Sequence, residues 1–175
     1  RSCHESVRKE DALAKMRLGM YAKLREGSAW HDLKEVVKAI TENQVSARFA
    51  ILISDDTHPD TLINNGHLDY IVKRAIEEGV NPITAIEMVT INVAECFYMG
   101  MDFGSISPGK IADINLISDL TKVRVEQVFI GGKLVAKDGQ MRVDTPQIAY
   151  PDWSKNTVKE GKTLSTDDFS IKSSG

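Results

Sequence analysis

The sequence predicts an α/β fold, with a parallel sheet in residues 1–103 and an antiparallel β-module after them. Strand and helix patterns alternate along residues 1–103, which is typical of right-handed βα units. The run 49–53, Phe-Ala-Ile-Leu-Ile, is continuously apolar and suits a parallel strand that is covered on both faces. Two strand patterns on either side of Gly131-Gly132 predict a hairpin.

Local spacing and stop signals predict the elements that surround this first strand. We expect a helix over 10–18 that ends at Gly19, followed by a short strand over 20–24. A second helix follows, because four apolar residues fall on one helical face: Leu33, Val36, Val37 and Ile40.

Three further helices are expected after the apolar strand. The first covers 68–76 and ends at Gly79. The second begins at Asn81-Pro82, the usual order of a cap followed by proline. We expect Asn92 to cap a short third helix that runs through Cys96.

The pattern changes after Phe103. Strands are expected over 111–117, 123–130 and 133–136, so an antiparallel module follows the α/β part. The polar stretch from Thr145 onward is interpreted as a linker or as the entrance to another domain.

Composition restricts the class of protein. The chain has 175 residues, of which 42% are hydrophobic and 27% are charged, which favours a soluble globular protein. With a net charge of −3 and scattered basic residues, neither nucleic acid nor a membrane surface is an expected partner. Cys3 and Cys96 form no framework of bridges, so we expect a cytoplasmic protein. Both ends suggest that the chain is cut from a longer protein.

Acidic residues follow the apolar strand directly, at Asp55 and Asp56. The carboxyl edge of a parallel sheet is where α/β proteins bind ligands. A carboxylate there suits a divalent cation and can take a proton from an activated water. Aspartate also caps helices and makes turns, so one of the two residues could be structural.

The remaining candidate side chains each have a structural alternative. His4 is either a metal ligand or a hydrogen-bonded structural residue, and His58 either shapes the pocket or is a loop residue. His67 could be only a cap or a surface side chain, and His31 is expected to face solvent. Arg25-Glu26 follows a strand, so the pair either lines the pocket or forms a surface ion pair.

Two segments resemble the amidohydrolase superfamily. These are 81–94 and 103–113, the latter containing the pattern G-x-I-x-x-G-x-x-A-D. In that superfamily such a segment leads from the last helices of a barrel into a small β-sandwich. The resemblance implies that residues 1–103 are the C-terminal portion of a (β/α)₈ barrel, about strands 6–8, and that 104–145 belong to the β-sandwich. Residues 146–175 would be a linker or an entrance to a further C-terminal domain.

A narrower group within the superfamily, the adenine deaminases, is similar to segments 17–20, 25–28, 54–60 and 66–69, and to the tail at 156–158. This resemblance implies hydrolysis of adenine to hypoxanthine and ammonia, a reaction of purine salvage. A homo-oligomer, expected to be a dimer, would use two divalent ions, Mn²⁺ or Fe²⁺, with Zn²⁺ as an alternative.

The resemblance also implies roles for individual residues. His4 matches the metal-binding histidine at the end of strand 6, and Asp55 matches the aspartate after strand 8 that binds metal and transfers the proton. Four residues are further candidates for contacting adenine or orienting ligands: Glu5, Arg25, Glu26 and His58. Asp56 would not bind the metal itself but would help to hold Asp55 in position. We therefore expect His4 and Asp55 to converge on a shared cation at the mouth of the barrel.

Several features of the family pattern are missing here. The sequence has four histidines and no His-x-His pair, and Cys3 stands where an acidic residue is expected before His4. This segment alone is thus expected to lack deaminase activity. Two alternatives stay open: another amidohydrolase, such as a cyclic amidase, deacetylase or other nucleobase deaminase, and a non-catalytic barrel that serves as a binding module.

Overall fold

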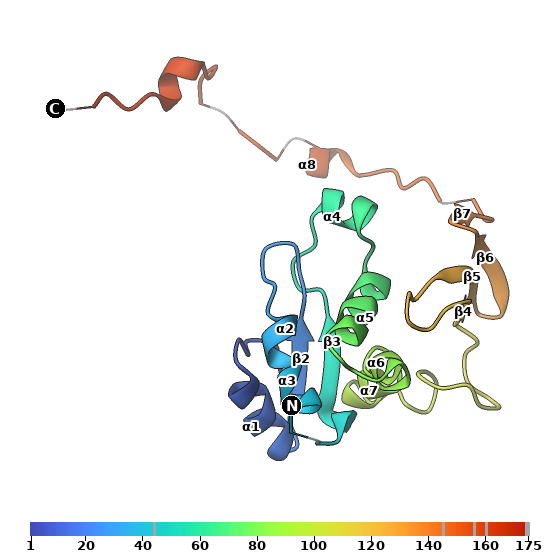
Figure 1. Cartoon of the computed structure of the whole chain (residues 1–175). Helices are drawn as coiled ribbons and strands as arrows, with labels where there is room; N and C mark the ends of the chain where they lie inside the picture. Colours follow the sequence, from blue (N-terminus) through green and yellow to red (C-terminus); the bar gives the residue numbers. More distant parts are fainter. Residues whose placement is uncertain (44, 145, 156, 160, 174–175) are drawn as a thin grey trace. The chain divides into compact units, whose positions relative to one another are not determined.

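The computed structural model describes residues 1–43, 45–144, 146–155, 157–159 and 161–173. The chain forms two compact units, Arg1–Val143 and Asp144–Gly175. The first unit contains a parallel sheet and an antiparallel sheet, which confirms the predicted α/β class and the change of pattern along the sequence (Figure 1).

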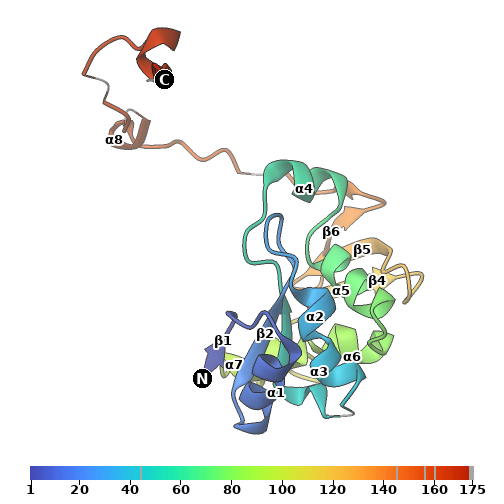
Figure 2. The same ribbon diagram turned by 60° about the vertical axis from the view of Figure 1, so that its left-hand side comes forward.

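The parallel sheet has three strands in the order in which they occur in the sequence. They are β1 (Ser2–Cys3), β2 (Tyr21–Arg25) and β3 (Ala50–Ile53). Figure 2 shows β1 and β2 running side by side. At the carboxyl end of the sheet, Arg25 is paired in register with Ile53. Because β1 also pairs with β2 in parallel, the carboxyl ends of all three strands face the same edge of the sheet.

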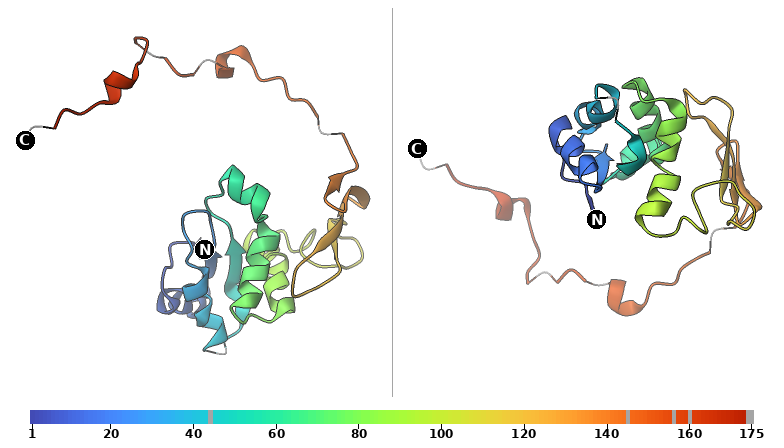
Figure 3. Two further views of the ribbon diagram at one scale, coloured as in Figure 1. Left: turned by 45° about the horizontal axis from the view of Figure 1, so that its top comes forward. Right: turned by 90° about the horizontal axis from the view of Figure 1, so that it is seen from below.

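Helices connect the strands and continue after β3, curving around the parallel sheet (Figure 3). They are α1 (Lys9–Arg17), α2 (Leu33–Val36), α3 (Lys38–Thr41), α4 (Pro59–Asn64), α5 (Leu68–Glu77), α6 (Pro82–Glu87) and α7 (Ile91–Cys96). A short 3₁₀ turn, η1 (Ala47–Phe49), leads into β3. The predicted helix at 10–18 and the two helices near 68–76 and 82 are confirmed within one or two residues.

Alternate strand residues build the core between sheet and helices. Leu24 and Leu52 are paired across β2 and β3, and both are buried in one apolar cluster with residues of α1, α2 and α5. Ile51 points to the other side of the sheet by alternation and is also buried, with 1% of its surface exposed. The apolar run is thus covered on both faces, as predicted.

Two helix predictions need correction. The single helix expected over Leu33–Ile40 is split at Val37, where Ile40 N bonds to Val37 O and tightens the turn. Leu33, Val36 and Val37 are nevertheless buried as predicted, and Ile40 is partly buried against the same core. The helix α4 was not predicted, because its sequence has no helical apolar spacing. In the structure Leu62 and Ile63 are accordingly exposed.

Asn92 does not cap α7. Thr90 holds the cap position, and Asn92 lies inside the helix with its side chain buried. Its amide nitrogen donates to the carbonyl oxygens of Ala47 and Ala50, both at 2.9 Å. The residue thus fastens α7 to the start of β3. By contrast, Asn81 caps α6 as predicted, with its Oδ1 3.0 Å from Ile83 N.

The antiparallel sheet contains β4 (Ile114–Ile117), β5 (Val125–Ile130), β6 (Lys133–Lys137) and β7 (Gln140–Met141), in that order. The predicted turn is confirmed, because Gly131 and Gly132 both have positive φ angles and join β5 to β6. The strand expected from residue 111 begins only at Ile114, since Asp113 uses its side chain to bind Gly131 N at 2.8 Å.

In the described residues of the second unit lie a short helix, α8 (Asp152–Lys155), and a 3₁₀ turn, η2 (Thr166–Phe169). The similarity noted at 156–158 begins at a residue outside the described part of the chain. Among the described residues, no helix has the length and apolar character needed to cross a membrane.

Candidate active site

Charged side chains from all three strand ends meet at the carboxyl edge of the parallel sheet. His4 and Glu5 follow β1, Arg25 is the last residue of β2, and Asp55 follows β3. Asp55 has a φ of +59°, a left-handed conformation that aspartate tolerates better than most residues and that turns the chain away from the strand. The edge predicted to carry the site therefore does collect these polar groups.

Arg25 is the hub of this cluster. Its Nε donates to Asp32 Oδ2 at 2.6 Å. Its Nη1 lies 3.1 Å from Glu5 Oε2 and 3.3 Å from Asp55 Oδ2. Only 6% of the Arg25 side chain is exposed, and its guanidinium carbon lies 5.2 Å from the centre of the Trp30 ring. Asp32 in particular holds the pKa of Arg25 above its ordinary value. The group is a buried, permanently charged cation.

His4 joins the cluster through its neighbour, because its Nε2 lies 2.9 Å from Glu5 Oε1. Contacts thus run from His4 to Glu5, from Glu5 to Arg25 and from Arg25 to Asp55. Within the described part of the chain, no polar contact joins His4 to Asp55 directly. The two residues predicted to share a cation lie on one edge, linked by two intervening side chains.

Glu26 and His31 form a second pair at this edge. The Glu26 side chain is 6% exposed, and its Oε1 lies 3.1 Å from Nδ1 of His31. His31 itself is 59% exposed, so it faces solvent as predicted. Arg25 and Glu26 are both buried and contact other partners, and the alternative of a surface ion pair between them is therefore wrong.

Asp56 turns away from Asp55 and binds the loop after β2. Its Oδ2 accepts hydrogen bonds from the backbone N–H groups of Ala29 at 2.7 Å and Ser28 at 3.0 Å. Burial opposes ionisation, but these bonds and that of its own N–H together keep the pKa of Asp56 below its ordinary value. A Cβ on Gly27 would lie 2.2 Å from Asp56 Oδ1, so the two loops touch. Asp56 is the structural member of the aspartate pair.

His58 and His67 contribute to the same edge in different ways. The His58 backbone N–H donates to Ser28 Oγ at 2.8 Å, while the residue as a whole is exposed. His67 starts α5, and its Nε2 lies 3.2 Å from Ser54 Oγ. His67 lies at the helix start as predicted, but its contact with Ser54 was not expected. Asp32 was not among the predicted site residues, because no local pattern distinguishes it from other surface carboxylates.

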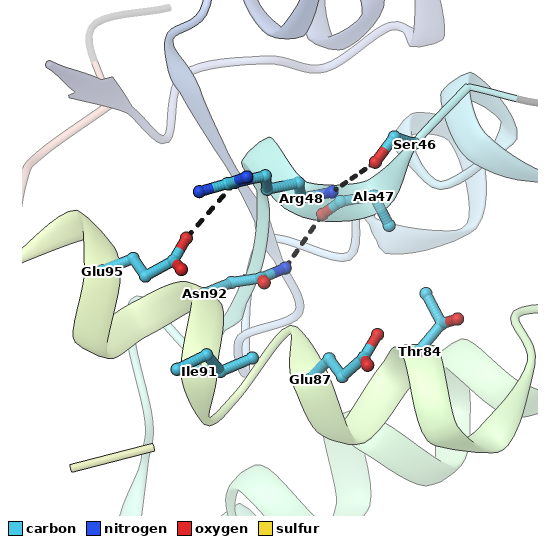
Figure 4. Close-up of a pocket in the computed structure, with 8 residues that line it drawn as sticks. All are labelled: Ser46, Ala47, Arg48, Thr84, Glu87, Ile91, Asn92 and Glu95. Atoms are coloured by element: carbon cyan, nitrogen blue, oxygen red, sulfur yellow. Dashed lines mark hydrogen bonds and ion pairs between the residues drawn. The ribbon is translucent and has the colours of Figure 1, made fainter. Parts of the chain in front are cut away.

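Two hollows flank the parallel sheet. The larger, of about 390 Å³, is lined by residues before β3 and by residues of α6 and α7 (Figure 4). Within it Asn92 bonds to Ala47 and Arg48 pairs with Glu95 at 3.4 Å, and none of the predicted site residues lines it. The smaller hollow lies between Glu26 and His67 and measures about 10 Å³, which is room for one water molecule and not for a purine.

Comparison with known proteins identifies the family. The model of the amidohydrolase family matches residues 28–135, more than half of the chain. This chain belongs to the amidohydrolase family. The resemblance found in segments 81–94 and 103–113 is thereby confirmed.

Relatives of this amidohydrolase chain share its sequence closely. It is 60% identical over 171 residues to the adenine deaminase of Clostridium botulinum (strain ATCC 19397 / Type A). It is 53% identical to the adenine deaminase of Moorella thermoacetica and 46% identical to that of Mesorhizobium japonicum. These alignments cover 98%, 97% and 96% of this chain, and 28% of each relative. The chain therefore spans little more than a quarter of its relatives' length, and the narrower resemblance to adenine deaminases is confirmed.

A solved structure supports the fold of this amidohydrolase chain. The β-aspartyl dipeptidase of Fervidobacterium islandicum AW-1 matches 79% of this chain and 39% of its own, with a TM-score of 0.60. The two sequences are 20% identical, so the likeness concerns the fold alone.

The amidohydrolase chain offers donors of the right kind for a divalent metal ion, but few of them. An imidazole and a carboxylate at one sheet edge suit first-row divalent ions. Glu5 contacts Nε2 of His4, so its carboxylate could orient the ring of this histidine as such groups do beside metal sites. Among the described residues, however, no group of three or more His, Cys, Asp or Glu side chains is placed to hold a metal. The chain can supply part of a metal site.

Proposed function

We propose that this chain is the part of an adenine deaminase that supplies two metal ligands, His4 and Asp55. Asp55 would also transfer the proton. The whole protein would convert adenine and water to hypoxanthine and ammonia. The observation that carries this proposal is the 60% identity, over 98% of the chain, to a protein described as adenine deaminase.

In this proposal β1, β2 and β3 are strands 6, 7 and 8 of a (β/α)₈ barrel. Three facts support the assignment: the strands are parallel, they are adjacent in sequence order, and helices separate them. Residues 1–103 would then be barrel, 104–145 part of a β-sandwich and 146–175 a linker. Strands of such a barrel present their catalytic residues at the carboxyl edge, where the charged cluster lies.

His4 and Asp55 are the proposed metal ligands. Enzymes of the amidohydrolase superfamily usually use divalent metals, and a binuclear site with Mn²⁺ or Fe²⁺ is proposed here. Such ions, when bound, polarise the substrate and make a water more acidic. The further ligands would come from the larger part of the relatives' length that this chain does not span.

Asp55 would handle the proton. Its carboxylate would accept a proton from the water that attacks C6 of adenine and would deliver it to the departing amine, which leaves as ammonia. Its side chain is 32% exposed, so it is accessible from the open edge of the sheet. Glu5 is 66% exposed at the same edge, and with His58 it stays a predicted contact of the purine. Glu26 is 6% exposed and paired with His31, so of its two predicted roles the orientation of neighbouring groups is the one proposed here.

An ammonia-release assay tests the proposal. The full-length protein, supplied with Mn²⁺, is incubated separately with adenine, cytosine, guanine and hydantoin. Ammonia is measured for the three bases, and ring opening of hydantoin, which releases no ammonia, is followed by chromatography. We expect adenine to be the preferred substrate and hypoxanthine to appear in equal amount to ammonia. Preference for a cyclic amide or another base would contradict the substrate assignment. Turnover by chelated protein, shown by metal analysis to be free of metal, would contradict the metal site. A full-length protein that is isolated without metal and is inactive would favour a binding module.

A further inference from the structure

We propose that Arg25 is a positioning residue, which holds Glu5 and Asp55 in place beside the metal site and does not bind the substrate. This inference rests on the proposed function, because it assigns a role within the same site. Of the two roles predicted from the sequence for Arg25, contacting adenine or orienting ligands, it selects the second.

The sheet order makes Arg25 unusual. β1 and β3 are not neighbours, since β2 lies between them. The Nη1 atom of Arg25 nevertheless contacts Glu5 after β1 and Asp55 after β3, at 3.1 and 3.3 Å. One nitrogen has two N–H bonds and can donate one to each carboxylate. A single side chain of the central strand thus fixes the spacing between the ends of the two outer strands.

The guanidinium is itself held firmly. Asp32 receives its Nε–H at 2.6 Å, and the Trp30 ring lies against it at 5.2 Å. Asp32 is 17% exposed, so this anchor is largely withdrawn from water, while the carboxylates on Nη1 are more accessible. A buried charge is stable only when it is paired, and here three carboxylates share it. Asp32 therefore anchors the Nε side of the guanidinium, and the Nη1 atom is left to hold Asp55.

Substrate binding fits this geometry poorly. The Nε and Nη1 donors already point at carboxylates, and 6% of the side chain is exposed. A purine could use these donors only by displacing a carboxylate, so the buried guanidinium would exchange a charged partner for a neutral one and lose a charge-assisted hydrogen bond. These contacts instead suit Arg25 to orienting Asp55, a proposed metal ligand. Losing a residue that orients a ligand typically lowers metal affinity or activity by about 10- to 100-fold.

The test compares three variants of the full-length protein: Arg25→Met, Arg25→Lys and the control Arg48→Met. Arg48 also forms an ion pair, with Glu95, but at the opposite end of the sheet. Each metal-depleted protein is titrated with Mn²⁺, and kcat and KM for adenine are measured on the reconstituted enzyme. The Mn²⁺ titration requires no substrate, so it reports on Arg25 even if the full-length protein does not deaminate adenine.

For Arg25→Met we expect Mn²⁺ affinity and kcat to fall by about 10- to 100-fold, with KM changed by less than about threefold. Arg25→Lys keeps the charge but cannot reach all three carboxylates, so we expect an intermediate loss. Should Arg25→Met fail to fold by circular dichroism, Arg25→Lys decides alone. Wild-type Mn²⁺ affinity and kcat in Arg25→Lys would overturn the proposal. So would a rise in KM with unchanged kcat and metal affinity, which would indicate substrate binding.

Discussion

The Nη1 atom of Arg25 lies 3.3 Å from Oδ2 of Asp55, so the last residue of β2 holds the second residue after β3. The adjacent Asp56 turns to the backbone of Ser28 and Ala29. Two consecutive aspartates therefore have different surroundings: one lies in the charged cluster at the open edge, and the other ties two loops together. This difference gives each residue a distinct expected mutant phenotype.

Replacing Asp55 with asparagine in the full-length protein should lower kcat for adenine at least about 100-fold, because it removes the proposed proton carrier. Asp56→Asn should be milder, since the amide keeps an oxygen that can accept from Ser28 and Ala29. Steady-state ammonia release measures both. Equal losses would show that the two residues do not divide their roles in this way.

Substitution of Gly27 by alanine should destabilise the fold by about 1–3 kcal/mol, the usual cost of overpacking. The added Cβ would lie 2.7 Å from the carbonyl oxygens of Ser54 and Asp56, and backbone atoms cannot move aside cheaply. Gly100→Ala is the control, because the nearest atom to its Cβ, on Glu95, is at an ordinary 3.6 Å. Urea denaturation compares the two, and matching stabilities would argue against close contact of the loops.

Asn92→Ala should also destabilise, by about 1–3 kcal/mol, since it leaves two carbonyl oxygens near the start of β3 without their donor. Asn43→Ala removes an exposed bond to the Lys38 carbonyl and should change stability by less than about 0.5 kcal/mol. The same denaturation assay measures this pair. A silent Asn92→Ala would mean that the buried amide does not fasten α7.

The loop between β4 and β5 should respond to pH through Asp119. Hydrogen bonds from the Thr121 hydroxyl, and then from the backbone N–H groups of Lys122 and Thr121, hold the pKa of Asp119 below its ordinary value. A lowered pKa contributes stability above the unfolded value, about pH 3.9, and that contribution disappears as the pH falls through the folded pKa. The difference in denaturation midpoint between wild type and Asp119→Asn should therefore shrink in acid. A difference that is constant from neutral to acid pH would contradict this.

Local patterns predicted much of the fold. The continuous apolar run identified β3, and through it the position of Asp55 at the edge of the sheet. Glycine and proline signals located the ends of α1, α5 and α6 and the hairpin turn. The missed elements lacked an apolar pattern: α4 begins at Pro59, a usual first position of a helix, but exposes Leu62 and Ile63, and β7 has two exposed residues.

The site was harder to predict, because its contacts join distant positions. Arg25 contacts residues 7, 20 and 30 positions away, and no local pattern reveals that one guanidinium serves three carboxylates. Asn92 shows the same limit. Its preference for helix caps suggested one role, while bonds to residues 42 and 45 positions earlier give it another. Burial and pairing across the sheet decide such roles, and both depend on the folded chain.

His4 and Asp55 are proposed to bind one metal site. A crystal structure of the full-length protein grown with Mn²⁺, with anomalous scattering measured for that metal, would show whether they do. We predict anomalous peaks about 2 Å from a ring nitrogen of His4 and from a carboxylate oxygen of Asp55, within one metal centre. Peaks that lie away from both side chains, or an ordered centre that binds only one of them, would contradict the account.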